Sequence, residues 1–120
     1  MVDWKPILKD DLRKRIAQGA ARMKPEERRL WNLIRIDPEK WQQKPFGTVG
    51  GGFWVVGIIG RTVVWYNDIE EGFNRSIYSS YGEIEDYWRN SDELDVTIQY
   101  LRVGLERGAD LIQIIRTRRG

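Results

Sequence analysis

The stretch GGGFWVVGIIGRTVVWYNDIEEGFN, residues 50–74, decides the fold of this 120-residue chain. Its two runs, residues 53–59 and 62–67, are rich in β-branched and aromatic residues, which favour strands. Between them lies Gly60-Arg61, and a glycine at the first position of a two-residue connection indicates a type II′ hairpin turn. Both faces of these runs are apolar, so the stretch predicts a central hairpin over residues 53–67 that is buried on both sides.

The flanking segments extend the predicted sheet. The acidic turn after the hairpin ends at Gly72, which we expect to adopt positive φ. Residues 73–77 predict a third strand of a meander, and residues 81–84 a short fourth one. Upstream, Ile34, Ile36 and Pro38 alternate with polar residues, which favours a short strand over residues 33–36 instead of a last helical turn. Residues 111–115 predict an edge strand or a docked turn.

Three helices are predicted to pack on this sheet. The first is predicted to have Pro6 in its first turn, and its apolar stripe recurs at helical spacing. The stripe consists of Leu8, Leu12, Ile16, Ala20 and Met23. The second helix opens at Pro25. The third spans about residues 91–106, with Asn90 as its cap, Glu93 completing a capping box and Gly108 as its stop. The sequence therefore predicts one α+β domain over residues 1–120, with an antiparallel meander of about four or five strands, two N-terminal helices and one C-terminal helix.

The composition excludes several classes of site. The chain contains no cysteine and no histidine, so disulfides, thiolate nucleophiles, Ser-His-Asp hydrolases and histidine-ligated metals are absent. We therefore expect a protein that is not an enzyme and that needs no cofactor. Its start lacks the apolar region of a signal peptide, and its longest apolar run is too short to cross a bilayer. We expect a cytoplasmic protein without a membrane partner.

The three glycines at the start of the stretch do not predict a phosphate-binding loop. Such loops lead from a strand into a helix N-terminus. Here the glycines precede a strand, and neither GxGxxG nor Gly-Lys-Ser/Thr occurs. We interpret them as a hinge that enters the central strand.

Charge is distributed unevenly along the chain. Residues 1–45 carry a net charge of +5, residues 46–100 a net of −6 and residues 101–120 a net of +3. Such asymmetry is typical of a partner-binding surface. The alternative is that the basic helix and the acidic sheet complement each other within the fold.

Acidic and aromatic residues gather after the central hairpin. Tyrosine, tryptophan and arginine are enriched at protein interfaces. Trp54 and Trp65 are expected in the core, whereas the later tyrosines are candidates for the surface. Our candidate protein-binding residues are Tyr66, Asp68, Glu70, Glu71, Arg75, Tyr78 and Tyr81. The alternative for these acids is an ordinary exposed turn, because the spacing D-x-E-E matches neither an EF-hand loop nor a catalytic motif.

Two further hypotheses belong to other classes. A nucleic-acid-associated protein would use the basic residues Arg13, Lys14, Arg15, Arg22, Arg116, Arg118 and Arg119. A carboxylate-based hydrolase would use a pair drawn from Asp68, Glu70, Glu71, Glu83 and Asp86. Because the aromatic residues lie in the acidic region, the sequence favours a protein partner over nucleic acid.

The stretch also carries a resemblance. Together with YG-x-I-x-x-YW at residues 81–88 and the capped helix, it resembles a family of small uncharacterised bacterial proteins over roughly residues 30–105. The family implies a bacterial protein and no particular activity. By analogy with other small acidic-aromatic domains, we expect a protein-binding module of the inhibitor or immunity type. Its partner is unidentified, and exposed aromatic residues are also compatible with a homodimer.

Overall fold

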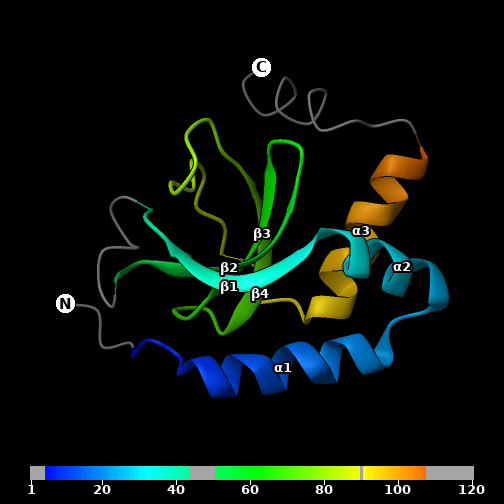
Figure 1. Cartoon of the computed structure of the whole chain (residues 1–120), viewed down its shortest axis with the longest axis horizontal. Coiled ribbons are helices and arrows are strands. Elements are labelled where there is room, and N and C mark those ends of the chain that lie inside the picture. The colour runs from blue at the N-terminus through cyan, green and yellow to red at the C-terminus, as the bar shows by residue number, and fades with distance from the viewer. Residues whose placement is uncertain (1–4, 44–50, 90, 108–120) are drawn as a thin grey trace.

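The computed structural model describes residues 5–43, 51–89 and 91–107, and it confirms the predicted α+β fold (Figure 1). Its elements are α1 (Lys9–Arg22), α2 (Pro25–Ile34), β1 (Arg35–Trp41), β2 (Phe53–Ile59), β3 (Thr62–Asn67), β4 (Gly72–Ile77) and α3 (Leu94–Glu106). The strand or turn predicted over residues 111–115 and the helix stop predicted at Gly108 lie outside the described residues.

The four strands form one antiparallel meander in the order β1-β2-β3-β4. The predicted central hairpin is confirmed, because Trp54 pairs with Tyr66 and Ile59 pairs with Thr62 across β2 and β3. Gly60 has a φ of 57°, as a glycine at the first position of a type II′ turn requires.

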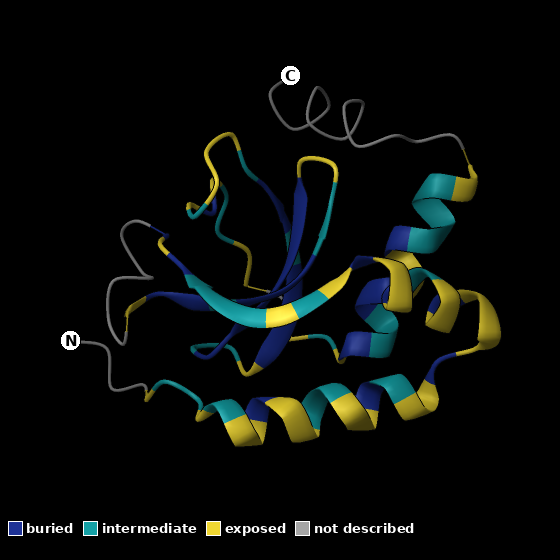
Figure 2. Ribbon diagram, viewed as in Figure 1, coloured by how far each residue is buried: buried dark blue, intermediate teal, exposed yellow. Residues whose placement is uncertain are grey.

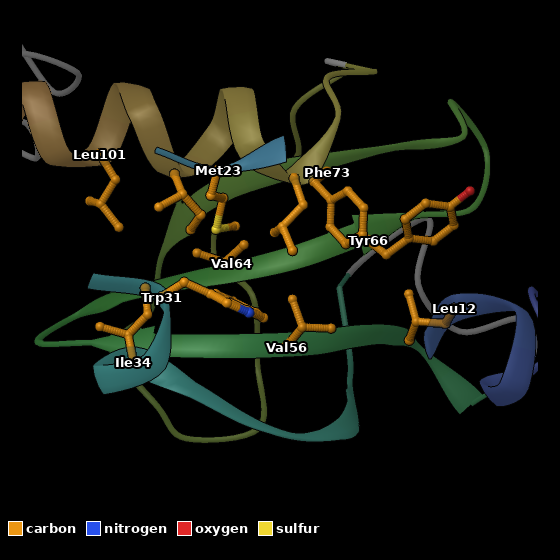
Figure 3. Packing of buried hydrophobic residues seen from close by; sticks show 11 residues of the cluster. Leu12, Met23, Trp31, Ile34, Val56, Val64, Tyr66, Phe73 and Leu101 are labelled. Atoms are coloured by element: carbon orange, nitrogen blue, oxygen red, sulfur yellow. The ribbon is translucent and has the colours of Figure 1, made fainter. Parts of the chain in front are cut away.

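The sheet is buried on both faces, as the two apolar phases of the hairpin predicted. Every residue of β3 is buried, whereas the outer side of α1 is exposed (Figure 2). The helices and one face of the sheet enclose the first core (Figure 3). Its buried residues are Leu12, Met23, Trp31, Ile34, Val56, Val64, Tyr66, Phe73, Leu94, Ile98 and Leu101. This helix-side core places all three helices on the same side of the central hairpin.

A second core lies on the opposite face of the sheet, and no helix covers it among the described residues. It consists of Trp41, Phe53, Val55, Val63, Trp65 and Ile84. Residues 78–89, which we call the closing segment, cover this face and form the yellow-green loop in Figure 1. Because the closing segment contributes Ile84 to the core, its path is fixed by burial as well as by hydrogen bonds.

The closing segment connects the two edge strands. The amide of Glu85 donates to the carbonyl of Ile77 at the end of β4 (3.1 Å). The amide of Ile84 donates to the carbonyl of Gln42, next to the end of β1 (2.8 Å). The strand predicted over residues 81–84 is therefore wrong in extent, because it is reduced to one parallel bridge between Gln42 and Glu83. These hydrogen bonds occupy one end of each edge strand, where backbone groups would otherwise be free to pair with another chain.

Two predicted boundaries need correction. The strand expected over residues 33–36 begins only at Arg35, because α2 continues to Ile34. The third helix begins at Leu94 rather than at residue 91, and Glu93 is its N-cap without a side-chain hydrogen bond. The capping box is therefore wrong, and its predicted cap at Asn90 lies outside the described residues.

The prediction of positive φ at Gly72 is also wrong, since the residue with positive φ in this turn is Glu71 (57°). The turn is held by Asn67, whose Oδ1 accepts from the amides of Ile69 (3.0 Å) and Glu70 (3.3 Å). Gly72 serves a different purpose. A Cβ there would lie 2.1 Å from the Cα of Ser91, so glycine is needed for the close approach of two backbones.

Candidate functional site

The most exposed part of the closing segment is built around an aromatic cluster. The ring of Trp41 contacts Tyr78 edge-on (centroids 5.0 Å apart, 88°) and Tyr81 at a tilt (4.6 Å, 54°). Trp41 is only 1% exposed, whereas Tyr81 is 67% exposed. A buried ring therefore supports an exposed one, and the Tyr78 hydroxyl adds a hydrogen bond to the carbonyl of Gly60 (3.0 Å).

Hydrogen bonds to Glu39 fix the same arrangement. Its Oε1 accepts from the indole nitrogen of Trp41 (2.9 Å) and from the hydroxyl of Tyr81. Glu39 and Trp41 are two residues apart on β1, so their side chains leave the same face of the strand. The hydrogen bond to Glu39 raises the pKa of Tyr81, because it stabilises the protonated phenol beside a carboxylate. Tyr81 therefore presents a neutral ring in a defined orientation.

A shallow hollow of about 320 Å³ lies beside these rings. It is lined by Gln42, Ser79, Ser80, Glu83, Ile84 and Glu85. Glu83 and Glu85 are exposed, and the Ser79 hydroxyl donates to Glu85. We call Glu39, Tyr78, Tyr81, Glu83 and Glu85 the acidic tyrosine surface. It combines three carboxylates with two tyrosines.

The structure brings only two of the seven predicted binding residues to this surface, namely Tyr78 and Tyr81. Tyr66 is buried in the helix-side core, with its ring edge-on to Phe73. Asp68 is buried at the end of β3, and Arg75 is half-buried beside the ring of Tyr100 on α3. The remaining two, Glu70 and Glu71, lie in the turn between β3 and β4, where Glu70 is half-buried and Glu71 exposed. The seven residues therefore do not form one continuous surface.

Sequence reasoning missed Glu39 and Trp41 as parts of a site. Their spacing of two residues on a strand, with a carboxylate and an indole on one face, is the signal that could have identified them. Glu83 was considered only as part of a catalytic pair.

Asp68 holds the segment before α1 against the sheet. Its Oδ2 accepts from the amide of Ile7 (2.6 Å), and the indole of Trp54 donates to the carbonyl of Ile7 (3.3 Å). Burial raises the pKa of Asp68, although the hydrogen bond from Ile7 and the charge of Lys40 oppose this effect. The neighbouring Tyr66 also has a raised pKa, mainly because it is buried.

This raised pKa predicts a specific pH dependence of stability. Because the folded protein favours neutral Asp68, the contribution of this carboxyl is fully present below its unfolded pKa and is lost as pH rises through its folded pKa. The stability of the wild type relative to Asp68→Asn should therefore decrease between acidic and neutral pH. Urea unfolding of both proteins at several pH values measures this difference in the free energy of unfolding. Glu70→Gln is the control on the same turn. A constant difference between Asp68→Asn and the wild type would contradict this account.

The two groups of acids proposed for a hydrolase lie apart. Glu71 precedes Gly72 at the start of β4, whereas the backbone of Glu85 is bonded to Ile77 at its end. Five residues of strand separate these ends, a distance of roughly 17 Å. Within the described ranges, no three acidic side chains are placed to hold a metal ion.

The cations of the predicted basic helix are largely engaged with other residues of the chain. Arg13 pairs with Asp37 (2.9 Å), and Lys14 pairs with Asp11 (3.9 Å). The guanidinium of Arg22 lies within 3.3 Å of carboxylates on Glu93 and Asp95, in or next to α3, and that of Arg15 lies over the ring of Tyr66. Arg116, Arg118 and Arg119 lie outside the described residues. For α1, charge complementarity within the fold accounts for much of the basic face.

No family model, curated protein or solved structure matches the chain. The resemblance to small bacterial proteins therefore stays a prediction. In the described part of the chain, none of the helices combines the length and apolar character that crossing a membrane requires.

Proposed function

We propose that this protein is a non-enzymatic protein-binding module that uses the acidic tyrosine surface. One observation carries the proposal: Tyr81 is largely exposed, yet its ring packs at a tilt against buried Trp41 and its hydroxyl is bonded to Glu39. An exposed aromatic side chain ordinarily loses rotamer freedom on binding. Here the fold has already restricted that freedom, which favours an interface anchor over an ordinary surface residue.

The charges around Tyr81 indicate the kind of partner. Glu83 and Glu85 are exposed on the same segment and Glu39 accepts from the Tyr81 hydroxyl, so the surface complements lysine and arginine residues on another protein. Such charges mainly raise the association rate and select the partner, while the aromatic anchor supplies affinity. We propose that the domain covers a basic site on its partner, in the manner of an inhibitor or immunity protein. The sequence features given above support a cytoplasmic, bacterial setting for it.

Charge reversal on this surface tests the proposal. The double variant Glu83→Lys/Glu85→Lys should lose capture of a protein partner from a bacterial lysate at moderate salt. The matched control is Glu70→Lys/Glu71→Lys, which makes the same change of charge on the turn between β3 and β4. Quantitative mass spectrometry of the captured proteins measures the difference, and the thermal transition of each variant shows whether it is folded.

The outcomes distinguish the hypotheses. Loss of the partner with the first variant and retention with the second supports the acidic tyrosine surface. The reverse pattern would assign binding to the turn at Glu70 and Glu71. Recovery of nucleic acid alone, and only at low salt, would move the function to the basic residues of the chain.

A further inference from the structure

A second hollow, of about 370 Å³, lies between α1, α2 and β1, away from the closing segment. We call it the basic groove. Its lining residues are Arg13, Ile16, Trp31, Arg35, Ile36, Asp37 and Pro38. The register of β1 against β2 shifts between Arg35 and Glu39, so this part of β1 departs from regular pairing where it lines the groove. Such bulges often occur beside binding sites.

The groove combines apolar and charged residues, and its net charge is positive. Ile16, Ile36 and Pro38 provide apolar surface. Asp37 is already shared by two cations, since it lies 2.9 Å from Arg13 and 3.5 Å from Lys9. By contrast, the exposed side chain of Arg35 has no ion pair or hydrogen bond within the part of the chain that the structure describes. One guanidinium therefore remains available beside an apolar surface.

Trp31 also lines the groove. Trp31 is 2% exposed, and its indole nitrogen has no acceptor among the described residues. A buried N–H without an acceptor is unfavourable, and groups of this kind are usually satisfied by a water or a ligand atom. Because this nitrogen is itself buried, Trp31 serves as a reporter of the groove and not as a donor to a ligand.

We propose that the basic groove binds a small carboxylic acid with an apolar body. Arginine binds carboxylates through two parallel hydrogen bonds, so Arg35 would hold the carboxylate. The apolar body would lie on Ile36 and Pro38. The volume of the hollow falls within the range of small-molecule sites. This site is separate from the acidic tyrosine surface and does not depend on the proposed partner binding.

Titration with 3-phenylpropanoate, followed by ¹H–¹⁵N NMR of the full chain, tests the proposal. The uncharged amide of the same acid is the ligand control. The indole resonance of Trp31, assigned with Trp31→Phe, and the amide of Ile36 report on the groove. We expect saturable shifts with a dissociation constant of about a few millimolar, as fits a ligand of this size, and much weaker binding of the amide.

A matched pair of arginine variants tests the role of charge. Arg35→Gln should weaken binding of the acid about tenfold. Arg29→Gln removes an equally exposed arginine from α2 that does not line the groove, and should leave binding unchanged. Absence of saturable shifts up to about 20 mM, equal binding of the amide, or unchanged affinity in Arg35→Gln would overturn the proposal. The comparison of the acid with its amide uses only the wild-type protein, so it tests the proposal even if a variant does not fold.

Discussion

Replacing Gly72 with alanine is expected to destabilise the protein by about 3 kcal/mol or more, one of the largest effects of a single methyl group in this chain. The added Cβ would lie 2.1 Å from the Cα of Ser91 and 2.8 Å from the amide nitrogen of Asp92. These are backbone atoms, so no side-chain rotation relieves the clash. Separation of the two segments would also break the hydrogen bond from the amide of Phe73 to the carbonyl of Asp92 (2.7 Å). The melting temperature should fall by on the order of 10 °C.

Gly82→Ala is the matched control for this experiment. A Cβ at Gly82 meets nothing within 4 Å, but the residue has a φ of 97°. Alanine there should cost about 1 kcal/mol through backbone strain alone. Urea unfolding of both variants separates steric clash from strain. Equal stability of Gly72→Ala and the wild type would show that the segment around Ser91 does not pack against β4 as described.

The regular elements could be predicted because their signals are local. The hairpin over residues 53–67 follows from two β-branched runs around Gly60, and the helices follow from apolar residues at helical spacing. The close approach of Ser91 to Gly72 has no such signal, because it depends on the path of a segment almost twenty residues away. For that reason, the sequence predicts positive φ at Gly72, whereas the residue that adopts it is Glu71.

The candidate site was predicted only in part, for a related reason. Both faces of the hairpin are apolar, so the sequence did not show how far the helices would bury Tyr66, or the segment before α1 would bury Asp68. Tyr78 and Tyr81 were selected by residue type. Trp41 contacts both tyrosines because irregular backbone joins the two edges of the sheet. Irregular segments have no sequence periodicity from which their path could be predicted.

Tyr81→Ala is expected to have the largest effect of any single substitution on partner binding. Interface energy is concentrated in a few aromatic and arginine residues that are held in place and surrounded by complementary groups. Tyr81 meets this description through Trp41 and Glu39. Its removal should weaken the complex about 30-fold or more, while stability changes little because the side chain is 67% exposed.

The matched control is Tyr100→Ala, since Tyr100 is also exposed (55%) but lies on α3, close to Arg75. The measurement that tests the central claim most directly is the dissociation constant of the purified partner, by calorimetry, for these two variants and the wild type. The account predicts a loss of about 30-fold for Tyr81→Ala and wild-type affinity for Tyr100→Ala. Wild-type affinity for Tyr81→Ala in a folded protein would contradict the assignment of binding to the acidic tyrosine surface.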